Sequence, residues 1–212
     1  MKLLIIAAGA AGAVLALGSC ATMSAEQCMA GDWGGQGYAD GQSGLTMSRL
    51  ADHAEACAKL GVVPDEPSYA AGRDQGLLRY CTPGKGFEVG RNGSSYAGVC
   101  PAELEAEFLP AYSDGRVVHE VVSALESARS SVSSLGGRLE ELDDKISAKQ
   151  AEARAEGLTD EQRDRILDRV QELRRERADR QRDWRRAQEE VDEAERDVRD
   201  VRRRFQYQYG GW

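Results

Sequence analysis

The C-terminal half of the chain has a regular spacing of apolar positions. From Val118 onward apolar residues recur every seven positions, and a second set follows three positions after the first, as at the a and d positions of a heptad repeat. The first set is Val118, Leu125, Val132, Leu139 and Ile146, and the second is Val121, Ala128, Leu135 and Leu142. This pattern predicts a helix that ends near Ala153 and, at ~1.5 Å per residue, extends about 50 Å.

A second helical arm follows a short interruption. Gly157 and Leu158 break the pattern, and Thr159 with Gln162 forms a capping box that predicts a new helix start. The apolar positions of this arm are Ile166, Val170, Leu173, Trp184, Ala187, Val191, Ala194, Val198, Val201 and Phe205. Two arms with a short link predict an antiparallel coiled-coil hairpin over 117–205, with its turn near 154–160. The alternative is an intermolecular coiled coil, which makes the protein a homo-oligomer.

The second arm carries two arginines, Arg177 and Arg180, where the heptad pattern needs apolar residues. In a hairpin folded about residue 157 these arginines lie opposite Gly136 and Gly137. We expect them to fill the space that the glycines leave, with each guanidinium reaching water. A hinge or a notch that docks a partner is the alternative.

Residues 206–212 form an aromatic tail. The aromatic residues Phe205, Tyr207 and Tyr209 alternate with polar ones, and Trp212 ends the chain. Because residue 205 returns beside residue 110, we expect the tail to pack on the glycine-rich part of the chain or to be disordered. The alternatives are a strand that binds a protein partner and a contact with membrane headgroups.

The first half of the chain has glycines, cysteines and few large apolar residues. Similar short segments recur: GYADG at 37–41, AGRDQG at 71–76, VGRNG at 89–93 and AYSDG at 111–115. Glycines four positions apart share one helical face and let helix backbones approach closely. We therefore predict short helices in which Trp33 and other aromatic residues lie across faces flattened by glycine.

Other signals mark the limits of these short helices. Residues 46–60 are amphipathic and end at Gly61, a suitable C-cap. Pro64 and Pro67 begin a further element that runs through Tyr80. The segment PGKGFEVGRNG at 83–93 fits neither a phosphate loop nor a dinucleotide fingerprint and reads as a turn-rich connection. We expect the two halves to separate near Pro110.

The chain has five cysteines, four of which lie in the glycine-rich part: Cys28, Cys57, Cys81 and Cys100. An even number of cysteines in an exported protein predicts two disulfides, with three ways to pair them. A helical hairpin of 32–44 and 46–60 brings Cys28 and Cys57 to one end, which favours Cys28–Cys57 and Cys81–Cys100. A zinc site is the alternative, but the sequence has no C-x-x-C. We therefore predict no metal and no cofactor.

The N-terminus has the features of a signal peptide, which we assign to 1–19. Its apolar stretch ends at Leu17 and is too short for a comfortable membrane span. The sequence Leu17-Gly18-Ser19-Cys20 resembles a bacterial lipobox, which implies a lipidated Cys20 followed by a linker over 20–27. Ala21, rather than Asp, implies the outer membrane with the protein facing the periplasm. An ordinary secretory signal is the alternative.

Charge and motifs narrow the chemistry. The net charge of −8 argues against nucleic-acid binding. The sequence has no G-x-S-x-G, H-E-x-x-H or Walker A motif. His53 reads as a surface or packing residue, and Asp40, Asp74 and Asp114 as turn or cap residues. We predict a protein that is not an enzyme; the alternative is an envelope hydrolase that uses His53 or these acids.

The glycines, cysteines and aromatic residues also occur in a fixed order. The series is Cys28-x₃-Asp32-Trp33, Gly37-x₂-Asp40-Gly41-x₂-Gly44, His53-x₃-Cys57, Gly61, Pro64-Asp65, Tyr69-x₂-Gly72-Arg73-x₂-Gly76-Leu77, Tyr80-Cys81 and Gly90-x₂-Gly93-x₂-Tyr96-x₃-Cys100. This series resembles the bacterial lipoprotein family filed as domain of unknown function 2799, over about residues 28–116. The resemblance implies an exported Gram-negative lipoprotein with no assigned activity.

These signals together predict a mainly α fold. A small, disulfide-stapled, glycine-rich helical domain (28–116) precedes the long antiparallel helical hairpin. The expected function is that of a non-catalytic cell-envelope lipoprotein, anchored by its lipid, that contacts a protein partner through the coiled coil or the tail. The alternative is an accessory subunit of a trans-envelope transport or assembly complex, contacted at the hairpin tip near 151–160.

Overall fold

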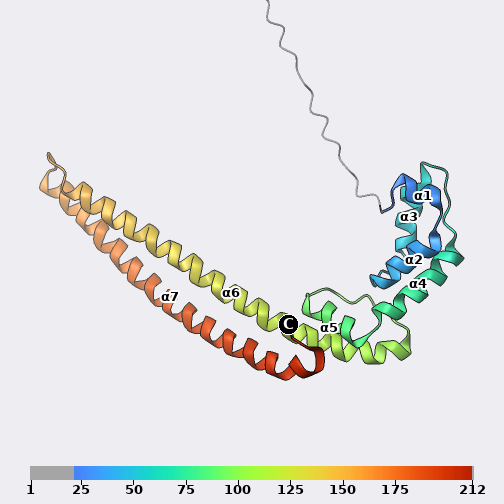
Figure 1. Cartoon of the computed structure of the whole chain (residues 1–212). Coiled ribbons are helices and arrows are strands. Elements are labelled where there is room, and N and C mark those ends of the chain that lie inside the picture. Colours follow the sequence, from blue (N-terminus) through green and yellow to red (C-terminus); the bar gives the residue numbers. More distant parts are fainter. Residues whose placement is uncertain (1–21, 212) are drawn as a thin grey trace, which may run out of the picture. The chain divides into compact units, whose positions relative to one another are not determined.

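The structure, a computed structural model, describes residues 22–211 (Figure 1). The predicted signal peptide 1–19, the predicted lipidation site Cys20 and the terminal Trp212 lie outside the described residues. Within 22–211 every regular element is a helix, which confirms the predicted mainly α fold. The chain divides between Arg79 and Tyr80 into two compact units, so the glycine-rich segment 28–116 contributes to both.

Unit 1 contains helices α1 (Ala25–Ala30), α2 (Trp33–Gln42) and α3 (Arg49–Ala58), and nearly all of α4 (Glu66–Tyr80). Local capping explains several of their limits. Ser24 and Gln27 form a capping box at the start of α1, and the Asp32 side chain accepts a hydrogen bond from Gly35 N at the start of α2. The segment 20–27, expected as a linker, belongs to the fold from Thr22 onward, because the next residue, Met23, is buried.

Helices α2 and α4 meet through glycines. A Cβ atom on Gly37 would lie 2.1 Å from the carbonyl oxygen of Tyr69, and one on Gly72 would lie 2.0 Å from that of Gly34. Gly41 and Gly76 are equally confined by the opposite backbone. Any side chain at these positions would force the two helices apart, so the expected close approach of backbones is confirmed.

The expected position of Trp33 is wrong. Trp33 is buried against the Cys28–Cys57 disulfide and Tyr69 rather than across the glycine faces. The glycine faces are filled by the backbone of the facing helix, which leaves no space for an aromatic ring.

Unit 2 contains α5 (Pro83–Arg91), α6 (Ala102–Ala153) and α7 (Asp160–Tyr209). The prediction of a turn-rich connection at 83–93 is wrong, because most of this segment is α5. The side chain of Thr82 accepts a hydrogen bond from Lys85 N, and Pro83 stands in the first turn, where a proline is tolerated. Two of its glycines, Gly86 and Gly90, face α6: a Cβ on Gly90 would lie 2.1 Å from Tyr112 O.

The α5–α6 pair repeats the contacts of the α2–α4 pair. Gly37 faces the backbone of residues 69 and 73, and Gly86 faces that of residues 108 and 112. Residue numbers in α2 become those of their counterparts in α5 when 49 is added, and numbers in α4 become those in α6 when 39 is added. The same shifts relate Gly41 to Gly90 and Gly76 to Gly115, so one contact pattern occurs twice in the chain.

The sequence suggested that the two halves of the chain separate near Pro110, and this prediction is wrong. Helix α6 continues through this proline and is 52 residues long. A proline inside a helix removes one backbone hydrogen bond and usually bends or ends the helix. Here α5 contacts α6 on both sides of the proline, at Phe108 and Tyr112, and this packing holds the helix in place.

Helices α6 and α7 form the predicted antiparallel hairpin, in which α7 lies beside α6 from the turn back to about Asp114 (Figure 1). The turn is close to the predicted place, since α6 ends at Ala153 and a capping box at Thr159 starts α7. Towards the turn a buried cluster holds the arms together, made of Leu142, Ile146, Val170 and Leu173.

The predicted register of the hairpin is wrong. Arg177 does not lie opposite Gly136, but donates two hydrogen bonds to Asp143, at 2.5 and 2.9 Å. Trp184 is the residue over Gly136, with its Nε1 atom 3.8 Å from where a Cβ would stand. An indole ring fills the space above a glycine without the cost of removing a charge from water, which explains this arrangement.

The aromatic tail is helical up to Tyr209, so this part of it does not form the strand that was considered as an alternative. Phe205 and Tyr209 are four residues apart and share a helical face, and both rings pack on Phe87 at centroid distances of 6.2 and 4.0 Å. Tyr207, on another face, is 91% exposed. The end of α7 therefore packs on the glycine-rich part of unit 2, which confirms the expectation that the tail packs there.

Both disulfides have the favoured pairing. Cys28–Cys57 joins α1 to the end of α3 in unit 1, with its Cα atoms 5.5 Å apart. Cys81–Cys100 closes the segment around α5 in unit 2, with its Cα atoms 5.6 Å apart.

Candidate functional site

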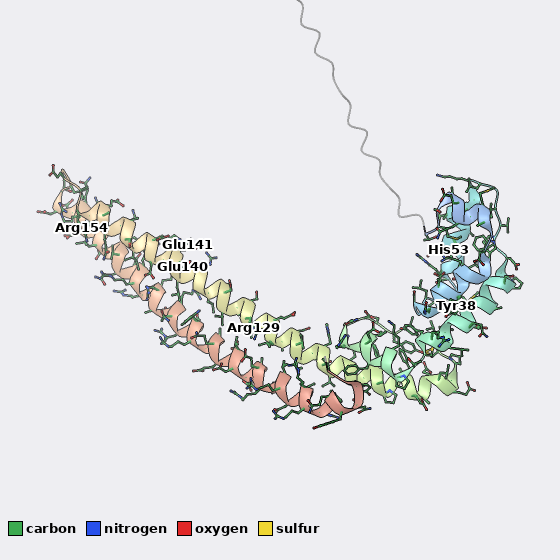
Figure 2. All side chains as sticks on the ribbon, in the orientation of Figure 1. Tyr38, His53, Arg129, Glu140, Glu141 and Arg154 are labelled. Carbon is green, nitrogen blue, oxygen red and sulfur yellow. A yellow bond between two sulfur atoms is a disulfide. The ribbon has the colours of Figure 1, made fainter. Side chains whose placement is uncertain are left out.

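Unit 1 contains a polar cluster of three buried residues, Asp40, His53 and Tyr69, together with the half-buried Thr22; His53 is labelled in Figure 2. Asp40 comes from α2, His53 from α3 and Tyr69 from α4, and their exposed fractions are 6%, 1% and 0%. Buried polar groups need hydrogen-bond partners to offset the loss of water. The contacts within the cluster therefore decide what it can do.

The carboxylate of Asp40 accepts three hydrogen bonds. Its Oδ2 lies 2.7 Å from the Tyr69 hydroxyl and 2.7 Å from His53 Nε2, and its Oδ1 lies 3.1 Å from Gln36 Nε2. Because a carboxylate only accepts, the hydrogen on His53 must sit on Nε2. This assigns one side of the imidazole ring to Asp40.

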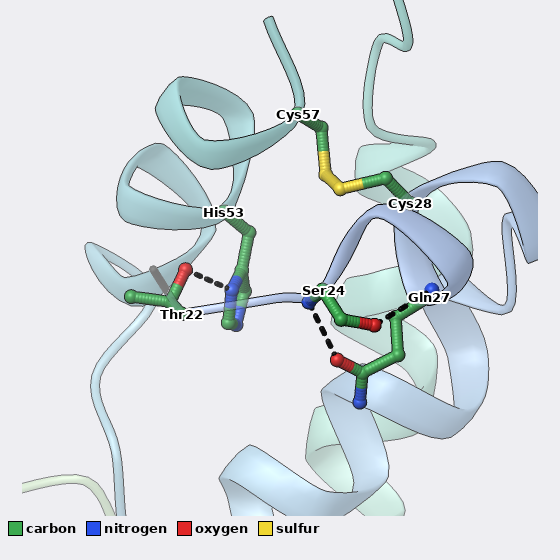
Figure 3. Close-up of a disulfide and its surroundings, with 6 residues drawn as sticks. All are labelled: Thr22, Ser24, Gln27, Cys28, His53 and Cys57. Carbon is green, nitrogen blue, oxygen red and sulfur yellow. Dashed lines mark hydrogen bonds between the residues drawn. A yellow bond between two sulfur atoms is a disulfide. The ribbon is translucent and has the colours of Figure 1, made fainter. Parts of the chain in front are cut away.

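The other side of the ring holds the N-terminal segment. His53 Nδ1 lies 2.7 Å from the hydroxyl oxygen of Thr22 (Figure 3). A threonine hydroxyl can donate or accept, so this bond forms with a neutral ring and with a charged one. Close by, Ser24 and Gln27 cap α1, and Cys28 ties that helix to Cys57 (Figure 3). The cluster and the disulfide thus fix the start of the described chain onto α3.

Tyr69 remains a donor over the neutral pH range. Burial of the phenol, and next its hydrogen bond to Asp40, raise the pKa of Tyr69 above its usual value. The hydroxyl therefore stays protonated and keeps its bond to Asp40.

A hydroxyl, an imidazole and a carboxylate in series are the groups of a nucleophilic triad. In this cluster they are enclosed: His53 is 1% exposed, and both of its ring nitrogens already have partners. A substrate would have to displace Thr22 and enter the core of unit 1. The contacts of the cluster therefore fix Thr22 to α3.

The counterparts of these residues in unit 2 are apolar. The repeat relates Asp40 to Val89 and Tyr69 to Phe108, both of which are buried. The same helix pair therefore packs without a carboxylate or a phenol hydroxyl. The polar cluster is an addition in unit 1, and what it adds is the attachment of Thr22 and α3.

The sequence predicted the role of His53 but not that of Asp40. His53 is a packing residue, one of the two expected roles, but the role of Asp40 as a turn or cap residue is wrong. Asp40 lies within α2, and Asp74 and Asp114 also lie within helices, where Asp114 accepts a hydrogen bond from the Tyr209 hydroxyl at 2.8 Å. No local motif joins Asp40 to His53, since they stand on different helices; the only signal was that both occur in the ordered family series.

The part of the chain that the structure describes offers no group of three or more His, Cys, Asp or Glu side chains placed to bind a metal. Among the helices of 22–211, none combines the length and apolar character that a membrane crossing requires.

The segment that contains the repeated helix pairs matches a known protein family. Residues 32–117 match the family described as "Protein of unknown function (DUF2799)". The match confirms the resemblance seen in the sequence. It begins at the N-cap of α2 and ends just after Gly115, so the family segment contains both glycine-packed contacts. Helix α1 and most of the hairpin lie outside it. No curated protein and no solved structure matches the chain.

Proposed function

We propose that the protein is a non-catalytic lipoprotein of the cell envelope, acylated at Cys20, that holds its folded part close to the membrane and presents the α6–α7 hairpin to the periplasm. The observation that carries this proposal is the bond between Thr22 and His53 in the core of unit 1. It places a fixed point of the fold two residues after the cysteine of the lipobox.

The short distance along the chain limits how far the anchor can lie from the fold. Two residues span at most about 7 Å, so the Cα atom of Cys20 lies within about 7 Å of that of Thr22. Two or three acyl chains on Cys20 are enough for stable anchoring in a membrane. A lipoprotein with a long flexible linker could move away from the bilayer, whereas this geometry keeps unit 1 beside it.

Two further features support the compartment and the absence of catalysis in this proposal. Both disulfides suit an oxidising compartment such as the periplasm. The buried imidazole of His53 lies between the Asp40 carboxylate and the Thr22 hydroxyl. Both of its ring nitrogens have partners, which leaves no access for a substrate.

The hairpin supports a role in contacts between proteins. Helix α6, which supplies one arm and continues past it to pack on α5, has 52 residues and is about 78 Å long at ~1.5 Å per residue. Most of the hairpin surface carries charged side chains of both signs, which suits a solvated rod that a partner can recognise.

The proposal is tested by the modification of Cys20. In a Gram-negative host, mass spectrometry of the mature N-terminal peptide should find acylated Cys20, and the protein should fractionate with the outer membrane. Cys20→Ser should abolish both results, whereas the control Ser19→Ala, which keeps a small residue in the lipobox, should leave them unchanged. An unmodified mature protein that starts at another residue contradicts the proposal.

A second candidate is an accessory subunit of a trans-envelope complex, contacted at the hairpin tip. The observation that favours it is a groove of about 300 Å³ at the tip, lined by Leu158 and Ile166 among charged residues. A photo-crosslinker at Gln162 should then capture one defined envelope protein, and the same crosslinker at Ser147 should not. Equal labelling at both sites contradicts this candidate.

A further inference from the structure

Two hollows follow one another along one side of the hairpin, and we call them together the groove. Its part nearer the turn, about 330 Å³, is lined on α6 by Ser134, Arg138, Glu141 and Lys145 among others, with Glu176 and Arg180 on α7. Its other part, about 370 Å³, is lined on α6 by Ala124, Ser127, Ala128 and Ser131 and on α7 by Glu190, Glu193, Ala194 and Asp197. The α6 residues follow one another at steps of three and four, so both parts lie on one side of the hairpin.

The two parts differ in charge. The part lined by Ala124–Ser131 has three acids and no base, and within 22–211 none of Glu190, Glu193 and Asp197 makes an ion pair or a side-chain hydrogen bond. The part nearer the turn has three bases and two acids. Its bases Arg138 and Lys145 both bind Glu141, in exposed pairs that exchange partners at little cost. One half of the groove is thus acidic and unpaired, and the other is weakly basic.

The segment between the centres of the two halves is uncharged, and six of its eight residues are serine or glycine. Residues 130–137 read SSVSSLGG, and none of them carries a charge. Gly137 has no described atom within 4 Å of where its Cβ would stand, so no contact within the chain requires a glycine there. A glycine inside a helix is destabilising relative to alanine. It follows Ser134 by three positions and precedes Glu141 by four, so it borders the groove.

We infer that this groove is the contact surface for a second copy of the chain, with two hairpins packed antiparallel about a twofold axis near Ser134. A twofold axis pairs each residue i with j and each j with i, so the acidic half of one copy meets the basic half of the other twice. The serines of 130–137 and Gly137 lie at the axis, where the two α6 backbones approach most closely. A second copy fits this surface because, when that copy is turned end to end, its basic half faces the acidic half of the first copy.

The two halves are well placed for such pairing. On α6 the acidic half is centred near Ser127 and Ala128 and the basic half near residues 139–140, which are about equally far from residues 133–134. Each centre lies about 9 Å from the axis, at ~1.5 Å per residue. This inference does not depend on acylation of Cys20, so either proposal can fail alone.

The test exchanges charges between the two halves. The mature chain with Cys20→Ser should have twice the mass of one chain in light scattering at low salt, and a smaller mass at high salt. Variant E190R/E193R and variant R138E/K145E should each raise the Kd for dimerisation at least about tenfold. A mixture of the two variants should form the dimer again, because their charges are now complementary.

A matched control and a crosslink complete the test. Variant E189R/D192R makes the same charge change off this side of α7 and should leave the mass of the wild-type dimer unchanged. In the full lipidated chain, Ser134→Cys should form a disulfide between copies near the axis, whereas Ser147→Cys, about 20 Å along the helix, should not. A wild-type monomer at high concentration, or a dimer that both charge variants retain, overturns the inference.

Discussion

The α2–α4 pair of unit 1 and the α5–α6 pair of unit 2 use the same glycine contacts but complete their cores with different chemistry. In unit 2 the residues around the contact are aromatic and aliphatic, and Phe205 and Tyr209 of α7 cover Phe87. In unit 1 the corresponding volume holds Asp40, His53 and Tyr69 with their hydrogen bonds. The glycines therefore set how closely the helices approach, and the residues beside them determine which further segment packs on the pair: α3 and Thr22 in unit 1, and the end of α7 in unit 2.

The largest effect is expected where a side chain is added between backbones. Gly37→Ala in unit 1 and Gly90→Ala in unit 2 each place a Cβ 2.1 Å from a carbonyl oxygen, so the helices must separate. We expect each substitution to lower the free energy of unfolding of its unit by about 3 kcal/mol or more. Chemical denaturation followed by circular dichroism measures this loss.

Gly84→Ala is the matched control, since no atom lies within 4 Å of its would-be Cβ. It should leave stability unchanged or raise it slightly, because alanine favours a helix. If Gly37→Ala is as well tolerated as Gly84→Ala, the close approach of α2 and α4 is wrong.

A smaller effect is expected when unit 1 is given one residue of unit 2. Asp40→Val places the counterpart Val89 in the cluster, but leaves His53 Nε2 and the Tyr69 hydroxyl without their acceptor. Unsatisfied buried groups cost about 1–3 kcal/mol each, so we expect a loss of about 2–4 kcal/mol in the free energy of unfolding. Thermal or urea unfolding of the purified variant measures it, and a stability equal to wild type contradicts the account.

In unit 2 the comparable polar contact joins Tyr209 to Asp114, at 2.8 Å. Burial, and next the hydrogen bond to Asp114, raise the pKa of Tyr209 to about 12. A raised pKa in the folded state means that this contact stabilises fully below the usual tyrosine pKa of about 10 and is lost as pH rises through about 12.

Tyr209→Phe should therefore cost about 1 kcal/mol at neutral pH and should remove part of the loss of stability above pH 10. Melting curves recorded across the alkaline range measure both effects. Identical pH profiles for the variant and the wild type would show that the contact does not form.

The smallest effect is expected on the surface of the hairpin. Arg177 and Asp143 form a two-pronged ion pair between the arms, but their side chains are 38% and 51% exposed. Ion pairs between exposed side chains contribute little to stability, and salt weakens them. Arg177→Ala should thus change the unfolding midpoint only slightly at low salt and not at high salt; a large change would mean that the pair determines the register.

The sequence predicted those features that depend on local periodicity. The heptad spacing, the capping box at Thr159 and the break at Gly157 located the two arms and their turn, because each signal is a property of neighbouring residues. The glycine spacing predicted close helix contacts for the same reason. The disulfide pairing followed once Cys28 and Cys57 were placed at one end of a helical hairpin.

The features that the sequence did not predict depend on residues far apart in the chain. Segment 83–93 looked like turns because glycine disfavours an isolated helix, and its contacts with α6 outweigh that preference. The partners of Arg177 and Trp184 depend on the register of two long arms, which the length of the turn alone does not fix. The cluster of Asp40, His53 and Tyr69 joins three helices, and no spacing in the sequence announces it.

The central claim is that this cluster holds segment 22–30, which follows the proposed lipidation site, rather than the helix pair itself. Hydrogen exchange of the triple variant D40V/H53L/Y69F, which imitates the apolar core of unit 2, tests it most directly. The account predicts that the backbone amides of 22–30 lose protection while those of α2 and α4 keep it. A variant in which 22–30 stays as protected as in the wild type, or in which α2 and α4 lose protection together with it, would contradict the claim.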